Sequence, residues 1–219
     1  MRRLSLLLAL AVLVGCGGSK KAAPPPRSAT TTPTSANGCR SVSAPAPRKN
    51  AGQKPPAHPL DPKKKYALVL QTNCGSFVIA LDQTLAPHTA ASLVSLARAG
   101  FYDRTIFHRI VPGFVIQGGD PTQTGAGGPG YKTVDRPPAS ARYVKGVVAM
   151  AKTQLERPGT SGSQFFVVTA ADAGLTPDYA IVGRVTRGMS VVDRIGKLGD
   201  ASEHPTRTVE IERVRITVS

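Results

Sequence analysis

Two side chains with strong hydrogen-bonding groups stand inside an apolar run of the sequence. In "FHRIVPGFVIQGGDP", residues 107–121, Arg109 and Gln117 lie among phenylalanine, isoleucine and valine residues. Because burying an arginine without a partner is very costly, these groups either pair within the chain or face a cleft that receives a ligand. A pairing within the chain would use Asp103 or Asp120. In a cleft, the guanidinium would be a fixed fork of donors that stays charged at working pH.

Other patterns that could do chemistry are weak. The four histidines show no metal-ligand spacing and have no cluster of acids beside them, so we expect no metal site. No Ser/His/Asp arrangement stands out, and "GTSGS" around Ser161 departs from the nucleophile-elbow pattern. "GAGGPG", residues 125–130, formally matches a dinucleotide-binding motif, but no helix follows it. We interpret it as a flexible loop and expect no cofactor.

From Tyr66 onward, short apolar runs alternate with turn signals. "YALVLQT" and "GSFVIALD" flank Asn73-Cys74-Gly75, which is typical of a hairpin. Further runs are "TIFHRIV", "GFVIQG", "GVVAMA", "QFFVVT" and "YAIVGRV". In the last run, the alternation of apolar residues changes parity near Glu212, which predicts a β-bulge there.

Only two helices are indicated. The first follows Pro87, which suits a first helical turn, and Gly100 is placed to end it. The second is indicated by Ser190 and Asp193, which have the spacing of a capping box. Many short strands with two helices predict a mainly β domain, a closed or nearly closed antiparallel barrel, over residues 66–219.

The first 65 residues have a different character. "MRRLSLLLALAVLVGCGGS" has two arginines, an apolar run that is short for a membrane span, and then small residues, which is typical of an export signal over residues 1–15. Residues 16–65 are rich in proline, serine, threonine, alanine and lysine. Such a composition buries too little apolar surface to offset chain entropy, so we expect a disordered tether.

The end of the signal, "LVGC", resembles the lipobox of bacterial lipoproteins. The resemblance implies cleavage before Cys16 and diacylation of its sulfur, which anchors the chain on the extracytoplasmic side of the bacterial cell membrane. The alternative is a plain signal peptide with an incidental cysteine. If Cys16 is lipidated, Cys39 and Cys74 are left as an even pair in an oxidising compartment, either joined by a disulfide or present as two unrelated thiols.

The formal charge of +15 is divided unevenly. Residues 1–65 contain 12 Lys and Arg residues and one acidic residue, which gives a net charge of +11. Residues 66–219 contain 16 Lys and Arg residues and 12 acidic residues, which gives a net charge of +4. A basic tether beside a membrane favours attraction to anionic lipid or cell-wall polymer. We expect no nucleic-acid partner, because interleaved aromatic residues are missing and export removes the chain from nucleic acid.

Four blocks in one order together resemble the cyclophilin family of peptidyl-prolyl isomerases. They are "FHRIVPGFVIQGGDPTQTGAGGPGY", "GVVAMAKT", "GTSGSQFFVVT" and "YAIVGRVTRGMSVVDRI". The resemblance covers essentially all of residues 66–219 and implies an eight-stranded antiparallel barrel capped by two α-helices. It also implies that proline-containing peptides and unfolded exported proteins are the partners of this chain, which we expect to be a monomer.

The resemblance also implies roles for individual residues. Arg109 matches the catalytic arginine, and Gln117 matches the side chain that hydrogen-bonds the substrate backbone. Gly174 stands where many family members have tryptophan, which predicts weak cyclosporin binding, and Tyr179 stands where many have histidine. The expected substrate-binding residues are Phe114, Val115, Ala151, Lys152, Gln164, Phe166, Leu175 and Tyr179.

The chemistry of prolyl isomerisation suits these residue types. Rotation about an X-Pro bond is opposed by roughly 18–20 kcal/mol, and a catalyst needs only to favour the twisted amide over the planar one. The sequence thus predicts a prolyl isomerase that assists folding at the cell envelope. The alternatives are a non-catalytic module that binds proline peptides and a structural envelope lipoprotein. A pure binder could lose Arg109, which this chain keeps.

Overall fold

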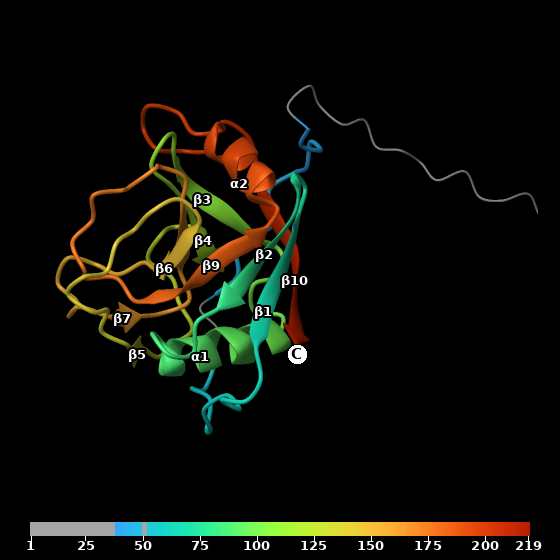
Figure 1. Ribbon diagram of the computed structural model, residues 1–219. Helices are drawn as coiled ribbons and strands as arrows, with labels where there is room; N and C mark the ends of the chain where they lie inside the picture. The colour runs from blue at the N-terminus through green and yellow to red at the C-terminus, as the bar shows by residue number, and fades with distance from the viewer. Residues whose placement is uncertain (1–37, 50–51) are drawn as a thin grey trace, which may run out of the picture. The chain divides into compact units, whose positions relative to one another are not determined.

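The computed structural model of the chain describes residues 38–49 and 52–219. Eight of its strands close into one barrel in the order β1-β10-β3-β4-β8-β6-β9-β2, and every neighbouring pair is antiparallel (Figure 1). The mainly β, closed eight-stranded fold predicted from the sequence is therefore confirmed. The barrel strands are β1 (Tyr66–Thr72), β2 (Gly75–Leu81), β3 (Thr105–Val111), β4 (Val115–Asp120), β6 (Val147–Met150), β8 (Phe165–Val168), β9 (Ile181–Arg187) and β10 (Glu210–Val218).

Side chains fill the interior of the barrel. Strand β1 alternates buried and partly buried residues, as a strand with one face in a core must. Phe107 and Phe165 pack edge to face at 6.1 Å between ring centroids, and Phe77 lies 6.4 Å from Phe107. The hollow that remains among the core side chains, lined by Leu68, Leu70 and Val148 among others, measures only about 10 Å³ and has no room for a ligand. We therefore look for a binding site on the outside of the barrel.

Strand β10 contains the bulge that the sequence predicted. Gln71 pairs with Arg213, but the next residue of β1, Thr72, pairs with Ile211, so Glu212 is left as the extra residue. The bulge allows both halves of β10 to direct apolar side chains to the core.

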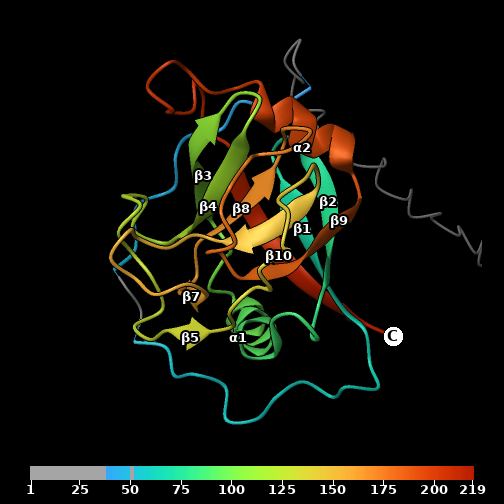
Figure 2. The ribbon, with the colours of Figure 1, turned by 60° about the vertical axis from the view of Figure 1, so that its left-hand side comes forward.

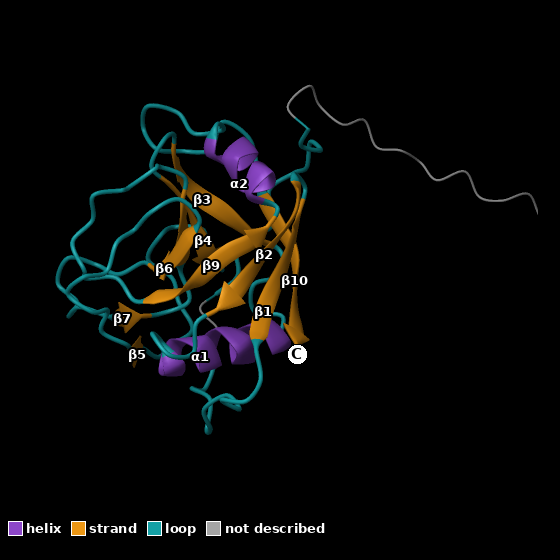
Figure 3. Cartoon of the chain, viewed as in Figure 1, coloured by secondary structure: helices purple, strands orange, loops and turns teal. Residues whose placement is uncertain are grey.

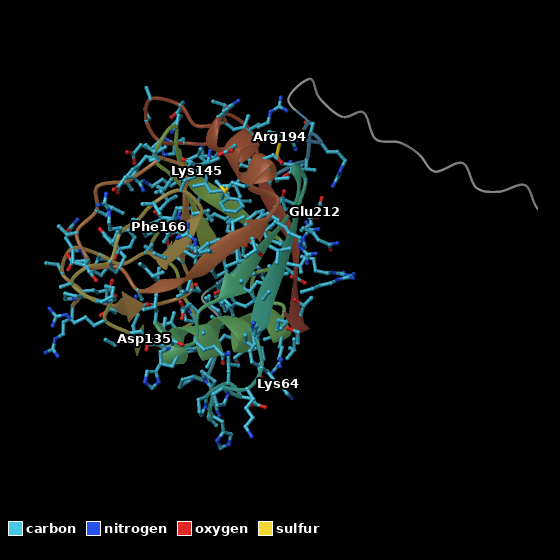
Figure 4. All side chains as sticks on the ribbon, in the orientation of Figure 1. Lys64, Asp135, Lys145, Phe166, Arg194 and Glu212 are labelled. Carbon is cyan, nitrogen blue, oxygen red and sulfur yellow. A yellow bond between two sulfur atoms is a disulfide. The ribbon has the colours of Figure 1, made fainter. Side chains whose placement is uncertain are left out.

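The two helices lie at opposite ends of the barrel (Figures 2 and 3). Helix α1 (Pro87–Arg98) starts at a proline as predicted, and its chain turns away at Gly100, where φ is +66°. The buried carboxylate of Asp135, labelled in Figure 4, accepts hydrogen bonds from the backbone nitrogen and the hydroxyl of Thr89, both at 2.6 Å. A carboxylate at a helix N-terminus stabilises the N–H groups that have no partner within the helix.

Helix α2 (Met189–Gly196) does not start with the predicted capping box. Its N-cap is Gly188, with φ of +79°, and Ser190 is already the second helical residue. Asp193 pairs with Lys145 at 2.8 Å instead of capping the helix. A side chain at Gly188 would collide with the carbonyl oxygen of Ser76, so close packing on β2 determines where this helix begins.

The described part of the predicted tether, residues 38–49 and 52–65, is attached to the barrel. Cys39 and Cys74 form a disulfide, and the backbone nitrogen of Arg40 donates to the carbonyl oxygen of Asn73 at 2.8 Å. Further along, the Arg48 guanidinium donates to the carbonyl oxygen of Phe101 at 2.6 Å. This differs from the expected disorder, because a covalent bond and hydrogen bonds replace the apolar burial that the segment lacks.

Two small strands, β5 (Thr133–Val134) and β7 (Thr160–Ser161), form a separate two-stranded sheet. Cys16 and the signal segment lie outside the described residues. Within residues 38–49 and 52–219, the structure contains no helix that is long and apolar enough to span a membrane. The same residues contain no group of three or more His, Cys, Asp or Glu side chains arranged to hold a metal ion.

Candidate functional site

A groove of about 240 Å³ lies on the outer face of the barrel. It brings together nine of the ten catalytic and substrate-binding candidates, and the tenth, Gln164, contacts it through Gln117. Gln154 also lines it and was not predicted. The full lining is Arg109, Phe114, Val115, Gln117, Ala151, Lys152, Gln154, Phe166, Leu175 and Tyr179.

A bulge in β3 explains why an arginine stands in an apolar run. Phe107 pairs with Gly118 and Arg109 with Gln117, so His108 is an extra residue without a partner in the ladder. Phe107 and Ile110 are both fully buried in the core although they are three residues apart. Regular alternation would turn Arg109 to the same side as Phe107. The extra residue reverses that direction and places Arg109 in the groove.

Strand register brings the polar and apolar parts of the groove together. Arg109 of β3 stands opposite Gln117 of β4, and Gln117 stands opposite Phe166 of β8. Phe166 is only 5% exposed and Val115 only 2%, so these two side chains form a buried floor. Figure 4 marks Phe166 on the barrel. Three neighbouring strands therefore hold two hydrogen-bonding side chains beside an apolar surface.

Behind the apolar floor lies Tyr143, a fully buried residue that the sequence analysis did not single out. Its ring lies 6.4 Å from that of Phe166 and 6.0 Å from that of Tyr179. Its hydroxyl donates to the carbonyl oxygen of Tyr179 at 2.7 Å and accepts from the backbone nitrogen of the same residue at 3.0 Å. Burial raises the pKa of Tyr143 to about 12, so the hydroxyl keeps its proton. Tyr143 thereby holds Tyr179, the edge of the groove, in place.

A row of hydrogen bonds fixes the polar side of the groove. Arg109 Nη1 donates to Gln117 Oε1 at 3.3 Å, and Gln117 Nε2 donates to Gln164 Oε1 at 3.1 Å. Gln164 Nε2 in turn donates to the carbonyl oxygens of Gly125 at 2.8 Å and Gly127 at 2.9 Å. Because both atoms of each amide are engaged, the orientation of the two glutamine side chains is determined.

The loop that ends this row is held by Asp120, which is fully buried. Its carboxylate accepts backbone N–H groups of Thr122 at 2.7 Å, Gly125 at 2.7 Å and Gly127 at 3.1 Å. Burial opposes ionisation of Asp120, but these hydrogen bonds outweigh it and lower its pKa. The segment is a loop, as predicted, but its backbone is fixed by a carboxylate instead of being free.

The acidic partner of Arg109 differs from both acids that the sequence analysis considered. Asp120 is occupied by its own loop, and Asp103 Oδ1 accepts the backbone nitrogen of Val214 at 2.8 Å. Arg109 Nε instead donates to Glu203 Oε2 at 2.6 Å. Glu203 lies 94 residues further along the chain, in a loop with no sequence signal for such a contact.

Lys152 lies at the edge of the groove, and Gly174 precedes the groove residue Leu175 in the chain. Lys152 Nζ donates to the carbonyl oxygen of Glu156 at 3.1 Å and sits 5.4 Å from the centre of the Tyr179 ring, so it belongs to the rim. At Gly174, φ is +62°, and a side-chain carbon placed there would meet no atom within 4 Å. The expected weak binding of cyclosporin stays a prediction.

Comparison with known proteins agrees with this geometry. Residues 67–216 match the family described as "Cyclophilin type peptidyl-prolyl cis-trans isomerase/CLD". Over 154 residues, the chain is 41% identical to "Peptidyl-prolyl cis-trans isomerase-like 1" of Gibberella zeae, which covers 68% of this chain and 93% of that protein. Over the same length it is 37% identical to "Peptidyl-prolyl cis-trans isomerase CYP18-2" of Arabidopsis thaliana, covering 68% and 92%.

Solved structures give the same result. A Cryptosporidium parvum cyclophilin type peptidyl-prolyl cis-trans isomerase superposes with a TM-score of 0.64 at 30% identity, covering 70% of this chain and 98% of that one. A structure of the same protein in the presence of the dipeptide Ala-Pro gives a TM-score of 0.64 at 31% identity, covering 69% and 98%. Fold, sequence and groove all agree, and the chain therefore belongs to the cyclophilin family of peptidyl-prolyl cis-trans isomerases.

Proposed function

We propose that the groove binds an X-Pro segment of a polypeptide and that Arg109 promotes rotation about its peptide bond. The observation that carries this assignment is the placement of Arg109 and Gln117 beside the buried Phe166 in one groove. The prolyl ring would lie on Phe166 and Val115, with Phe114 and Leu175 around it. No proton transfer and no covalent intermediate is needed, because the reaction is a rotation.

Arg109 acts on the twisted state of the amide. On twisting, the prolyl nitrogen regains its lone pair and becomes a hydrogen-bond acceptor, which it is not in the planar state. Arg109 uses Nε and Nη1 for Glu203 and Gln117. Its remaining nitrogen, Nη2, has no hydrogen-bond partner among residues 38–49 and 52–219 and is thus available to the prolyl nitrogen. A bond that forms only in the twisted state lowers the barrier.

Gln117 fixes the other side of the rotating bond. Its amide nitrogen carries two hydrogens, and only one is used for Gln164. The second can hold a substrate carbonyl group while the prolyl side turns. The planar amide is the more charge-separated form, so the apolar floor formed by Phe166 and Val115 also disfavours the planar state relative to the twisted one.

The test is the cis–trans exchange rate of a short X-Pro peptide, measured by NMR exchange spectroscopy with and without the protein. We expect acceleration that is lost in Phe166→Ala, because the seat of the prolyl ring is removed. Asp193→Ala, which alters an exposed ion pair on α2, serves as the matched control and should leave the rate unchanged. Binding of the peptide by the wild-type protein without acceleration would mean a binding module instead of an enzyme.

We further propose that the protein assists the folding of exported polypeptides at the cell envelope, anchored through a lipid on Cys16. The signal-like residues 1–15 and the "LVGC" sequence support this proposal. The disulfide between Cys39 and Cys74 also supports it, because such bonds persist mainly in oxidising compartments.

Metabolic labelling with an alkyne analogue of palmitate tests the anchor. The wild-type protein expressed in a bacterium should take up the label and sediment with membranes, whereas Cys16→Ser should lose both properties. If the wild-type protein remains unlabelled, or if Cys16→Ser keeps the label, the lipid anchor is excluded.

A further inference from the structure

We propose that Glu203 is a positioning residue for catalysis, which orients the Arg109 guanidinium so that its terminal nitrogens face the groove. The inference rests on the proposed role of Arg109 and adds a residue that lies outside the substrate groove. Four features of the structure carry it: the loop that presents Glu203, the two contacts that Glu203 makes, the solvent exposure of the pair, and the hollow beside Arg109.

The loop between α2 and β10 is organised to present Glu203 to strand β3. Asp200 Oδ1 accepts the backbone nitrogens of Ser202 at 2.8 Å and His204 at 2.9 Å, and the backbone nitrogen of Asp200 donates to the carbonyl oxygen of His204 at 2.9 Å. At its tip, Glu203 has a left-handed backbone with φ of +67°. Non-glycine residues rarely adopt this conformation, so the surrounding bonds must hold it.

The loop lies directly against β3. A side chain at Gly199 would collide with the carbonyl oxygen of Ile110, so glycine is required for this close approach. The backbone nitrogen of Ile110 donates to the carbonyl oxygen of Glu203 at 2.9 Å. Strand β10 pairs with β3 only at Thr105 and Ile106, so the loop occupies the edge of β3 where β10 is absent.

Glu203 therefore contacts two consecutive residues of β3 in different ways. Its backbone oxygen bonds Ile110, and its side chain accepts the Nε–H group of Arg109 at 2.6 Å. A hydrogen bond between two charged groups is directional as well as strong. Because the anchor at Ile110 fixes the start of the Glu203 side chain, the carboxylate determines the direction of the guanidinium plane.

Global stability does not account for this ion pair. The side chains of Arg109 and Glu203 are 34% and 48% exposed, and exposed ion pairs contribute little to folding. The use of Nε is informative, because it leaves Nη1 for Gln117 and Nη2 for a ligand. A carboxylate on the terminal nitrogens would instead occupy the donors that the reaction requires.

Packing alone does not fix the guanidinium. On the side away from the apolar floor, Arg109 faces a second hollow of about 450 Å³, which it lines together with His108, Thr124 and Glu203. Arg109 and Gln117 thus form the boundary between two hollows. With open space on that side, an arginine has rotamer freedom that must be restricted before it can donate in a defined direction. Glu203, with the shorter of the two hydrogen bonds to Arg109, provides this restriction together with Gln117.

The first experiment measures kcat and KM for an X-Pro peptide with Glu203→Ala and Glu203→Gln in the full chain. We expect Glu203→Ala to lower kcat about tenfold with little change in KM, because peptide binding by the apolar floor is preserved. Glu203→Gln should lie between this variant and the wild type, since its amide oxygen can still accept the Nε–H bond. Asp193→Ala breaks an exposed ion pair of the same kind outside the groove and controls for charge loss.

A second readout separates positioning from a structural effect. In the wild-type protein, the Nε–H proton of Arg109 should exchange slowly with water and give an NMR signal separate from those of the other arginines. In Glu203→Ala, this signal should move to the chemical shift of solvent-exposed arginines. In an Arg109→Ala background, measured at high protein concentration, adding Glu203→Ala should cause no further loss of rate. If the catalysed rate of Arg109→Ala is too small for this comparison, the Nε–H signal of Arg109 serves as the test, and a signal that is unchanged in Glu203→Ala overturns the positioning role.

The outcomes distinguish this inference from the proposed function. No acceleration by the wild-type protein would overturn the proposed function itself. If Arg109→Ala loses activity while a folded Glu203→Ala keeps its full kcat or becomes faster, only the positioning role is overturned. An equal loss of rate from Glu203→Ala with and without Arg109 would also overturn it, since Glu203 would then act independently of the guanidinium.

Discussion

Single residues behind the groove matter as much as those that line it. Tyr143 does not line the groove itself, yet its hydroxyl bonds both the carbonyl oxygen and the backbone nitrogen of Tyr179. In the same way, His108 is an extra residue in β3 and directs Arg109 outward. The chemistry of the groove therefore depends on residues whose own side chains do no chemistry.

Replacing Tyr143 with phenylalanine tests this dependence. Tyr143→Phe leaves two backbone groups of Tyr179 without their partner, so we expect a loss of about 1–3 kcal/mol in the free energy of unfolding and weaker peptide binding. Tyr131→Phe is the matched control, because its hydroxyl bonds Ser92 at 2.9 Å, away from the groove. Urea denaturation and peptide titration measure the two effects. Unchanged peptide affinity in Tyr143→Phe would show that Tyr179 needs no such support.

Among the elements, the Asp120 loop should respond to pH. The pKa of Asp120 is lowered in the folded state from its ordinary value of 3.8. A group with a depressed pKa stabilises the folded state above its unfolded pKa and loses this contribution as pH falls through its folded pKa. The stabilisation by Asp120 is thus fully present above about pH 4 and is lost only in stronger acid.

The variant Asp120→Asn should remove this contribution at every pH. In the wild type, backbone N–H groups point at a carboxylate oxygen, and in the variant some of them would face an amide nitrogen instead. We therefore expect the free energy of unfolding to fall by about 2 kcal/mol or more at pH 7. The difference in free energy of unfolding between the wild type and Asp120→Asn should become smaller as the pH falls below about 4. Urea denaturation at pH 7 and at pH 3 measures this difference. A gap that stays constant or widens in acid would contradict the assignment.

The segment before β1 is held by one covalent bond and several hydrogen bonds. The disulfide joins Cys39 and Cys74 across a sequence separation of 35 residues, and both residues are buried. Closing a loop of that length stabilises a fold by roughly 3–4 kcal/mol on the chain-entropy model. Arg194 of α2 reaches the same turn, where Nη1 donates to the carbonyl oxygen of Cys74 at 2.7 Å (Figure 4).

Reduction of the disulfide should therefore lower the denaturation midpoint substantially. The double variant Cys39→Ser/Cys74→Ser should match the reduced wild type and show no response to reductant, which controls for effects of the reductant itself. Equal midpoints for oxidised and reduced wild-type protein would mean that the hydrogen bonds of Arg40 and Arg48 suffice.

Across the whole molecule, the parts that the sequence could predict are those with a local signal. Short apolar runs between turn signals predicted the strands, and the change of parity near Glu212 predicted the bulge in β10. The groove residues came from the family resemblance. The bulge at His108 had no comparable signal, because apolar residues surround it on both sides. Glu203 could not be predicted, since its contact with Arg109 depends on how a distant loop packs on β3.

The central claim is that Arg109 acts on the twisted amide more than on the bound peptide. One NMR titration with wild type and Arg109→Ala measures both the peptide affinity and the exchange rate within the complex. We predict that the affinity changes by less than about tenfold while the catalysed exchange falls about a hundredfold or more. Equal losses of affinity and rate, or an exchange rate unaffected by the substitution, would contradict the account.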